Sequence, residues 1–87
     1  MAKLFIRHRV ADFGKWKIVY DDNEATRIKY GAKKADVFTS TKNPNEIIVV
    51  TEWGSKEQAK KFVESSALSD AFKRAGLLGA PEVTYAE

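Results

Sequence analysis

The 87-residue sequence contains no cysteine, one histidine and two prolines. Without cysteine the chain has no disulfide bonds, no thiolate metal ligands and no cysteine nucleophile. The single imidazole, that of His8, excludes a multi-histidine metal site. No phosphate-binding glycine loop and no serine-centred catalytic motif is present. We therefore expect a protein with no metal centre and no bound cofactor.

Long apolar segments are also missing. The longest uninterrupted run is Ile47–Val50, far below the roughly 20 residues that a membrane-spanning helix needs. The N-terminal residues Met1-Ala2-Lys3 lead directly into an alternating segment and carry no signal-peptide core. We expect a cytoplasmic protein that does not contact a membrane.

Excess charge of one sign is limited. The net charge is +3, and residues 1–44 carry ten of the fifteen basic side chains. A basic half is compatible with an anionic partner. However, no recognition helix, RNA-binding aromatic signature or zinc knuckle accompanies it. We expect these charges to be solvated and predict no nucleic-acid partner.

Alternation of apolar and polar residues predicts four strands. The composition is typical of a globular chain, and its length predicts one domain spanning residues 1–87. In the first segment Leu4, Ile6, His8 and Val10 share one face, and Phe5 and Arg7 lie on the other. The predicted strands are 3–10, 34–41, 46–53 and 82–86, with a turn at Asn43-Pro44-Asn45.

Capping residues predict two helices. The first begins after Asp12 as N-cap and ends at Gly31, which accepts a left-handed conformation. The second begins with the capping box Ser55-Lys56-Glu57-Gln58, is interrupted near Ser65-Ser66, and ends at Gly76.

The predicted order β-α-β-β-α-β defines a ferredoxin-like α+β fold with both helices on one face of an antiparallel sheet. Strands 3–10 and 46–53 are expected to form a central parallel pair. The other sheet face then has no cover, although it carries the apolar side chains of Phe5, Ile48 and Val50. An uncovered apolar face predicts a homodimer in which two sheets pack face to face.

Charged residues share this uncovered face. Arg7 and Arg9 have the same parity as Glu52 under the expected parallel pairing. We expect these side chains to pair at or near the dimer interface, because an unpaired buried charge is costly.

One segment carries a family resemblance. Residues 51–62, TEWGSKEQAKKF, resemble the E-W-x-S-x-E-x-A-x-x-F run of the dimeric α+β barrel superfamily. That superfamily includes antibiotic biosynthesis monooxygenase-like proteins, small polyketide cyclases, stress-responsive barrel proteins and haem-degrading monooxygenases. The Asp12-Phe13-x-x-Trp16 start and the 75–82 segment look like those of a subgroup of small members. The motif points to the fold more than to one chemistry.

The resemblance implies a ligand cleft between sheet and helices within each protomer. Trp53 matches the family tryptophan that lines this cleft in haem-degrading members. Those members also use an iron-binding histidine on the second helix, which this chain lacks. Haem degradation is therefore not expected.

The candidate site residues lie on the helix-facing side. His8 is the candidate catalytic base, because its pKa lies near neutral pH. Trp16, Tyr20, Asn23 and Trp53 are the candidate substrate-binding residues, since aromatic side chains with a polar tip suit a flat ligand. Each also has a plain structural interpretation: His8 as a hydrogen-bonded histidine at the edge of the core, the aromatic residues as core packing, and Asn23 as the edge of the helix–sheet interface.

Three functions remain open from the sequence. The first is an enzyme resembling the cofactor-independent monooxygenases or cyclases, acting on a hydrophobic or aromatic compound. The second is a non-catalytic ligand-binding or stress-responsive dimeric module. The third is an interaction domain whose cleft is filled by Trp16, Tyr20 and Phe72.

Overall fold

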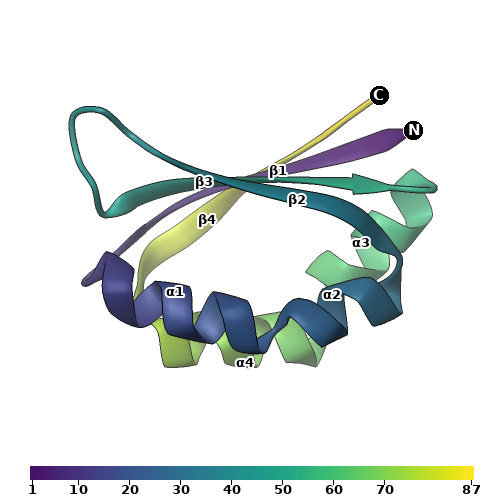
Figure 1. Ribbon diagram of the computed structural model, residues 1–87. Helices are drawn as coiled ribbons and strands as arrows, with labels where there is room; N and C mark the ends of the chain where they lie inside the picture. Colours follow the sequence, from purple (N-terminus) through teal and green to yellow (C-terminus); the bar gives the residue numbers. More distant parts are fainter.

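The computed structural model describes residues 1–87 and has a two-layer α+β architecture. Its elements in chain order are β1 (Ala2–Val10), α1 (Phe13–Asp22), α2 (Glu24–Tyr30), β2 (Ala32–Thr39), β3 (Glu46–Trp53), α3 (Lys56–Val63), α4 (Ser66–Ala75) and β4 (Leu77–Ala86). The four strands form one sheet in the order β2-β3-β1-β4. The helices lie together against one face of this sheet, and the other face is bare (Figure 1). The ferredoxin-like fold class is confirmed.

The central strand pair differs from the expectation in its direction. β1 and β3 are neighbours, but they run antiparallel, with Leu4 opposite Thr51 and Ile6 opposite Val49. The α1–α2 crossover returns the chain so that β2 runs in the same direction as β1. The turn after β2 then reverses the chain, which makes β3 antiparallel to both neighbours. The predicted parallel pairing was therefore wrong.

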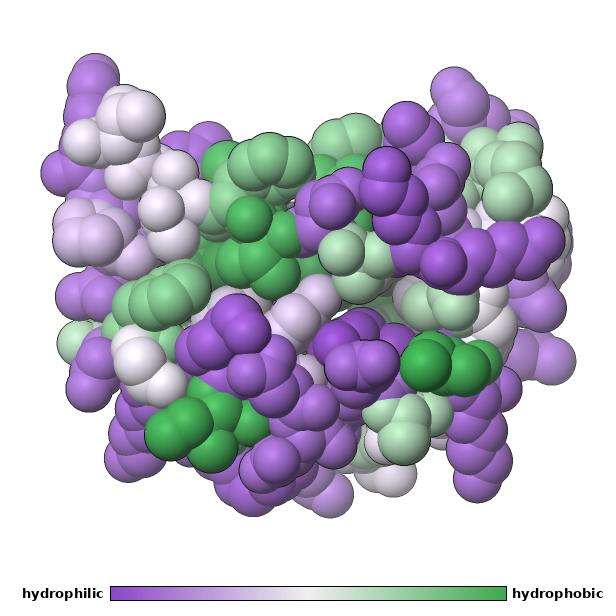
Figure 2. Space-filling model, in the orientation of Figure 1, coloured by the Kyte–Doolittle hydropathy of each residue, from purple (hydrophilic) through white to green (hydrophobic).

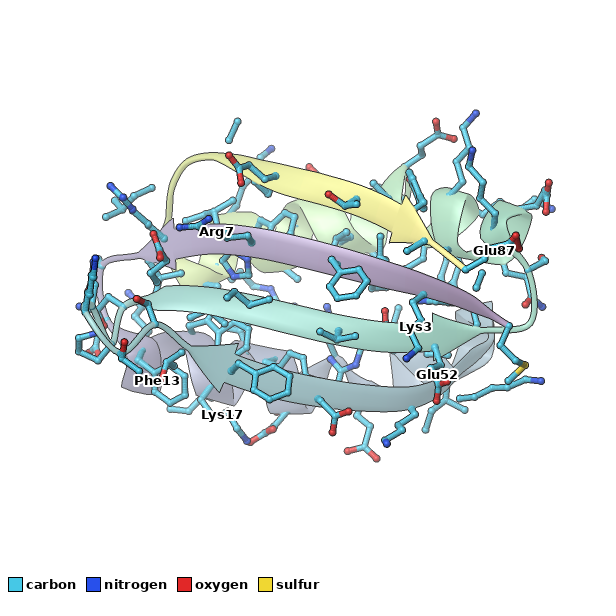
Figure 3. The ribbon with its side chains drawn as sticks, turned by 90° about the horizontal axis from the view of Figure 1, so that it is seen from above. Lys3, Arg7, Phe13, Lys17, Glu52 and Glu87 are labelled. Atoms are coloured by element: carbon cyan, nitrogen blue, oxygen red, sulfur yellow. The ribbon has the colours of Figure 1, made fainter.

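The antiparallel register also changes the ion pairs on the bare face. Arg9 lies opposite Glu46, whereas Glu52 lies opposite Lys3. Figure 3 shows Lys3 and Glu52 side by side on this face. The guanidinium groups of Arg7 and Arg9 donate to the Glu46 carboxylate at 3.0 and 3.2 Å, and these hydrogen bonds lower its pKa. The expected pairing of the two arginines with Glu52 was therefore wrong.

The helix-facing side of the sheet forms the core, as the alternation predicted. Every inward residue of the two central strands is buried: Ala2, Leu4, Ile6, His8 and Val10 on β1, and Ile47, Val49, Thr51 and Trp53 on β3. One apolar cluster joins Leu4, Ile6 and Trp53 to Phe62 of α3. A second joins Val10, Ile47 and Val49 to Trp16 of α1 and Ala75 of α4. His8 is the one ionisable side chain on this inward face of β1.

The first predicted helix is broken at Asn23. Asn23 has φ −92° and ψ 4°, and it separates α1 from α2. The break follows three successive residues, Asp21-Asp22-Asn23, whose side chains compete for backbone hydrogen bonds and have low helix propensity. The predicted interruption of the second helix is confirmed, because Ser65 caps α4 by accepting a hydrogen bond from the Leu68 amide.

Two strand boundaries also differ from the expectation. β2 begins at Ala32, directly after the left-handed Gly31, and ends at Thr39. β4 begins at Leu77, well before the predicted start at residue 82, because its pairing with β1 shifts register between Arg7 and Arg9. This irregularity spans Pro81, which has no amide hydrogen to donate and is tolerated on an edge strand.

Candidate functional site

A largely apolar cavity lies between the sheet and the helices. Fourteen residues line it. The sheet supplies Ile6 and His8 of β1 and Val49 and Thr51 of β3. The helix layer supplies Trp16, Val19 and Tyr20 of α1, Asn23 between α1 and α2, Arg27 of α2, Phe62 of α3, and Leu68, Ala71, Phe72 and Ala75 of α4. The lining surrounds about 520 Å³ that no atom occupies, a volume that includes space open to solvent. The part in which the centre of a water molecule fits is about 50 Å³. Figure 2 shows the surface between the sheet layer and the helix layer in the orientation of Figure 1.

One helical stripe supplies the polar wall of this cavity. Trp16, Tyr20, Asn23 and Arg27 follow one another at spacings of four, three and four residues. This period keeps them on one helix face even though the helix is interrupted at Asn23. The stripe changes along its length from aromatic to polar and then to cationic, so opposite ends of the cavity differ in chemistry.

His8 is buried without a hydrogen-bond partner. Its side chain is 5% exposed, and neither Nδ1 nor Nε2 has a partner within the protein. Its ring centroid lies 5.7 Å from that of Trp16 and 5.5 Å from that of Phe72. Burial lowers the pKa of His8 to about 4, so that the imidazole is neutral at pH 7. A neutral imidazole presents one donor and one acceptor to a ligand.

Arg27 and Tyr20 form the cationic end of the cavity wall. The Arg27 guanidinium carbon lies 3.7 Å from the Tyr20 ring centroid, and its Nη1 donates to the Tyr20 carbonyl oxygen at 2.8 Å. Tyr20 also stacks on Trp16, with ring centroids 4.8 Å apart. Burial raises the pKa of the Tyr20 phenol and lowers that of Arg27. Helical spacing from the sequence predicts that either Arg27 or Ile28 continues this face; the structure places Arg27 there and leaves Ile28 exposed.

The remaining predicted residues divide into two groups. Asn23 lines the cavity and its side-chain amide makes no hydrogen bond within the protein, whereas Trp53 is fully buried beside the cavity and does not line it. Trp53 acts on the site indirectly, because its Nε1 donates to the Thr51 hydroxyl oxygen at 2.7 Å and thereby orients that group. The structure thus brings together His8, Trp16, Tyr20 and Asn23, and adds Arg27 and Thr51.

The cavity is open but narrow. Trp16, Tyr20 and Phe72 line its walls without filling it completely. The 50 Å³ that remains is about a third of the roughly 150 Å³ of an engineered cavity known to bind benzene. A ring compound therefore needs a wall side chain to move. Tyr20 and Phe72 are the two aromatic candidates, because both are only partly buried.

Two kinds of feature are not found among the described residues. No group of three or more histidine, cysteine, aspartate or glutamate side chains lies close enough together to hold a metal ion. None of the helices has the length and apolar content needed to cross a membrane.

Comparison with known proteins defines the class of fold. No protein-family model matches the sequence, and no curated protein matches it. Solved structures do match over nearly the whole chain, and among them are antibiotic biosynthesis monooxygenase-like proteins. The chain has the ferredoxin-like α+β fold of these proteins, which confirms the structural side of the resemblance seen in residues 51–62.

Two individual structures illustrate this similarity. A Bordetella bronchiseptica protein, provisionally assigned as an antibiotic biosynthesis monooxygenase, superimposes with a TM-score of 0.85 at 12% identity, over 99% of this chain and 94% of its own. SnoaB, a cofactor-independent oxygenase from Streptomyces nogalater, superimposes with a TM-score of 0.80 at 10% identity, over 99% of this chain and 90% of its own. At such identities the similarity establishes the fold.

The burial of His8 predicts a pH-dependent stability. The folded protein holds this pKa at about 4 whereas the unfolded chain has about 6.5, so the unfolded state binds the proton first as the pH falls. The free energy of unfolding is therefore unaffected by this titration above pH 6.5 and falls as the pH is lowered from about 6.5 to about 4. The total fall due to His8 amounts to about 3 kcal/mol. Urea unfolding of the wild type and His8→Leu across this range measures it. The wild type should lose about that much more stability on acidification; equal losses in the two proteins would show that His8 titrates normally.

Proposed function

We propose that the protein binds a hydrophobic or aromatic small molecule in the cavity between sheet and helices, and that it is a cofactor-independent monooxygenase or cyclase. The observation that carries this proposal is the neutral imidazole of His8, buried with both ring nitrogens unpartnered on the wall of an apolar cavity. A buried polar group without a partner is costly, and a ligand that completes the hydrogen bonds of His8 would remove that cost. The fold shared with SnoaB supports the same class of chemistry.

His8 acts in this proposal as the base. Its unprotonated nitrogen takes the proton from an acidic hydroxyl or methylene group of the ligand, which leaves an electron-rich anion. Such an anion reacts directly with dioxygen or closes a ring. For oxygenation at a methylene carbon the balance is CH₂ + O₂ → C=O + H₂O, so one oxygen atom enters the product and the other leaves as water.

The energetics show what else the cavity must supply. Transfer of a proton from a phenol of pKa about 10 to an imidazole of pKa about 4 is uphill by about six pKa units, or about 8 kcal/mol. Pairing of the new imidazolium with the new anion offsets part of this cost in a low-dielectric site. Hydrogen bonds from Asn23 and Thr51 to the anion would offset more, since both line the same cavity.

The same low pKa favours a second function. An imidazole of pKa about 4 is a weak base but a good neutral hydrogen-bonding group. A non-catalytic module would use His8 and Asn23 to orient a ligand without changing it. Binding without oxygen uptake or product formation distinguishes this module from the enzyme.

Turnover is the test of the enzymatic proposal. Oxygen uptake and product formation are followed with a panel of phenols and hydroquinones, with no added cofactor and with heat-denatured protein as the blank. Removal of the base in His8→Ala should lower turnover by about 10²- to 10⁴-fold. Lys60→Ala, at an exposed position on α3 outside the cavity, is the matched control and should keep full activity. Undiminished turnover in His8→Ala would remove His8 from the mechanism.

We also propose that the bare sheet face is the interface of a homodimer. This face, seen from above in Figure 3, carries Phe5, Ile48 and Val50 on its two central strands and Phe38, which is 54% exposed, on the edge strand β2. Around them lie eight charged residues of balanced sign: Lys3, Arg7, Arg9 and Lys34 against Asp36, Glu46, Glu52 and Glu82. A face with an apolar centre and no net charge suits packing against its own copy.

The dimer is tested by mass in solution. At micromolar concentration, sedimentation should give twice the chain mass of 9.8 kDa. Ile48→Asp places a charge at the centre of the bare face and should give a monomer. Ile18→Asp makes the same kind of change at a 65% exposed position on α1, outside the sheet, and should leave the dimer intact. A monomeric wild type would contradict the proposed interface.

A further inference from the structure

Arg27 is a buried cation without an acidic partner. It is 7% exposed, and none of the four ion pairs of the structure includes it. Asp21 and Glu24 are near enough to influence its charge, but neither carboxylate reaches within 4 Å of it. Among the residues that line the cavity, Arg27 is the only one with a permanent charge.

Most of its hydrogen-bonding capacity is unused. A guanidinium group has five N–H donors, and the protein engages Arg27 through the single bond from Nη1 to the Tyr20 carbonyl oxygen. Stacking on the Tyr20 ring fixes the plane of the group without using another donor. The nitrogens that make no hydrogen bond are not among the buried atoms of the protein, so they are accessible at this end of the cavity, where an anionic oxygen would pair with the charge.

The position of Arg27 connects the cavity to the surface. Arg27 and Tyr20 line the cavity on one side and an outer groove on the other, where Lys33 and Lys34 add positive charge beside Asp21 and Glu24. The groove encloses about 660 Å³ not occupied by atoms, including space open to solvent, against about 520 Å³ for the cavity. A ligand whose ring lies against His8 and Trp16 would therefore extend toward Arg27 in the direction of the larger opening.

We propose that Arg27 binds an anionic oxygen group of the ligand, as in a carboxylate, so that the cavity selects aromatic acids over neutral compounds of the same shape. This inference deepens the proposed function and rests on it only in that the ligand occupies the same cavity. The planar guanidinium presents parallel N–H groups to two oxygens of a carboxylate, which gives both affinity and orientation. The ring is then held with its reacting edge toward the imidazole.

Benzoate and benzamide are the probes, because they have the same shape and differ in charge at neutral pH. Isothermal titration calorimetry measures both dissociation constants for the wild type, Arg27→Gln, Arg27→Lys and Arg74→Gln. Arg74 is exposed on α4, outside the cavity, so its variant is the matched loss of one positive charge. The wild type and Arg74→Gln should bind benzoate at least about tenfold more tightly than benzamide. Arg27→Gln should lose this preference while its benzamide affinity stays within about threefold, and Arg27→Lys should keep part of it.

Each other outcome overturns the inference. Three results for the wild type alone would contradict the anion site: equal binding of the two probes, tighter binding of benzamide, or no binding of benzoate. A benzoate preference that persists in Arg27→Gln would show that another residue binds the carboxylate. Failure of the enzymatic proposal is separate: benzoate selectivity in a protein without turnover leaves Arg27 as the anion-binding residue of a binding module.

Discussion

The unpartnered imidazole of His8 is the feature on which the account of this protein depends. The fold places it on the inward face of β1, between Ile6 and Val10, where every neighbouring position of the alternation is apolar. A leucine at this position would pack without the desolvation cost of two unpaired nitrogens, which is about 1–3 kcal/mol for each buried polar group. A core that carries such a cost beside an open space has the physical character of a binding site.

The wall opposite His8 gives the site its direction. Its stripe changes from aromatic to cationic along Trp16, Tyr20, Asn23 and Arg27. At the break between α1 and α2, the side-chain amide of Asn23 makes no hydrogen bond within the protein. Deprotonation by a weak base needs stabilisation of the resulting anion, and a buried guanidinium needs a negative partner. An aromatic compound with an anionic oxygen would give Arg27 that partner and place its ring in the same cavity as His8.

Much of the fold could be predicted because residue alternation and capping are local signals. The inward positions of β1 and β3, the helix start with Ser55 as N-cap and the stop at Gly76 were predicted correctly from the sequence; the Gln58 side chain does not complete the capping box. Strand direction was not predicted correctly: residue parity is the same for parallel and antiparallel neighbours, and the direction implied by the predicted crossover helix and turn was missed. The error carried Arg7 and Arg9 to the wrong carboxylate. Within the site, helical spacing brought Trp16, Tyr20 and Asn23 to the cavity, but only packing showed that Trp53 lies behind Thr51 and that Arg27 has no acidic partner.

A crystal structure of the protein soaked with benzoate tests the central claim most directly, because it locates the ligand without depending on turnover. The account predicts a ring in the cavity against His8 and Trp16, an outward displacement of Tyr20 or Phe72, and the carboxylate within hydrogen-bonding distance of the Arg27 guanidinium. It also predicts that the imidazole of His8 contacts the ligand rather than another protein group. A cavity that remains empty while benzoate occupies another surface, or a His8 ring turned to a hydrogen bond within the protein, would contradict it.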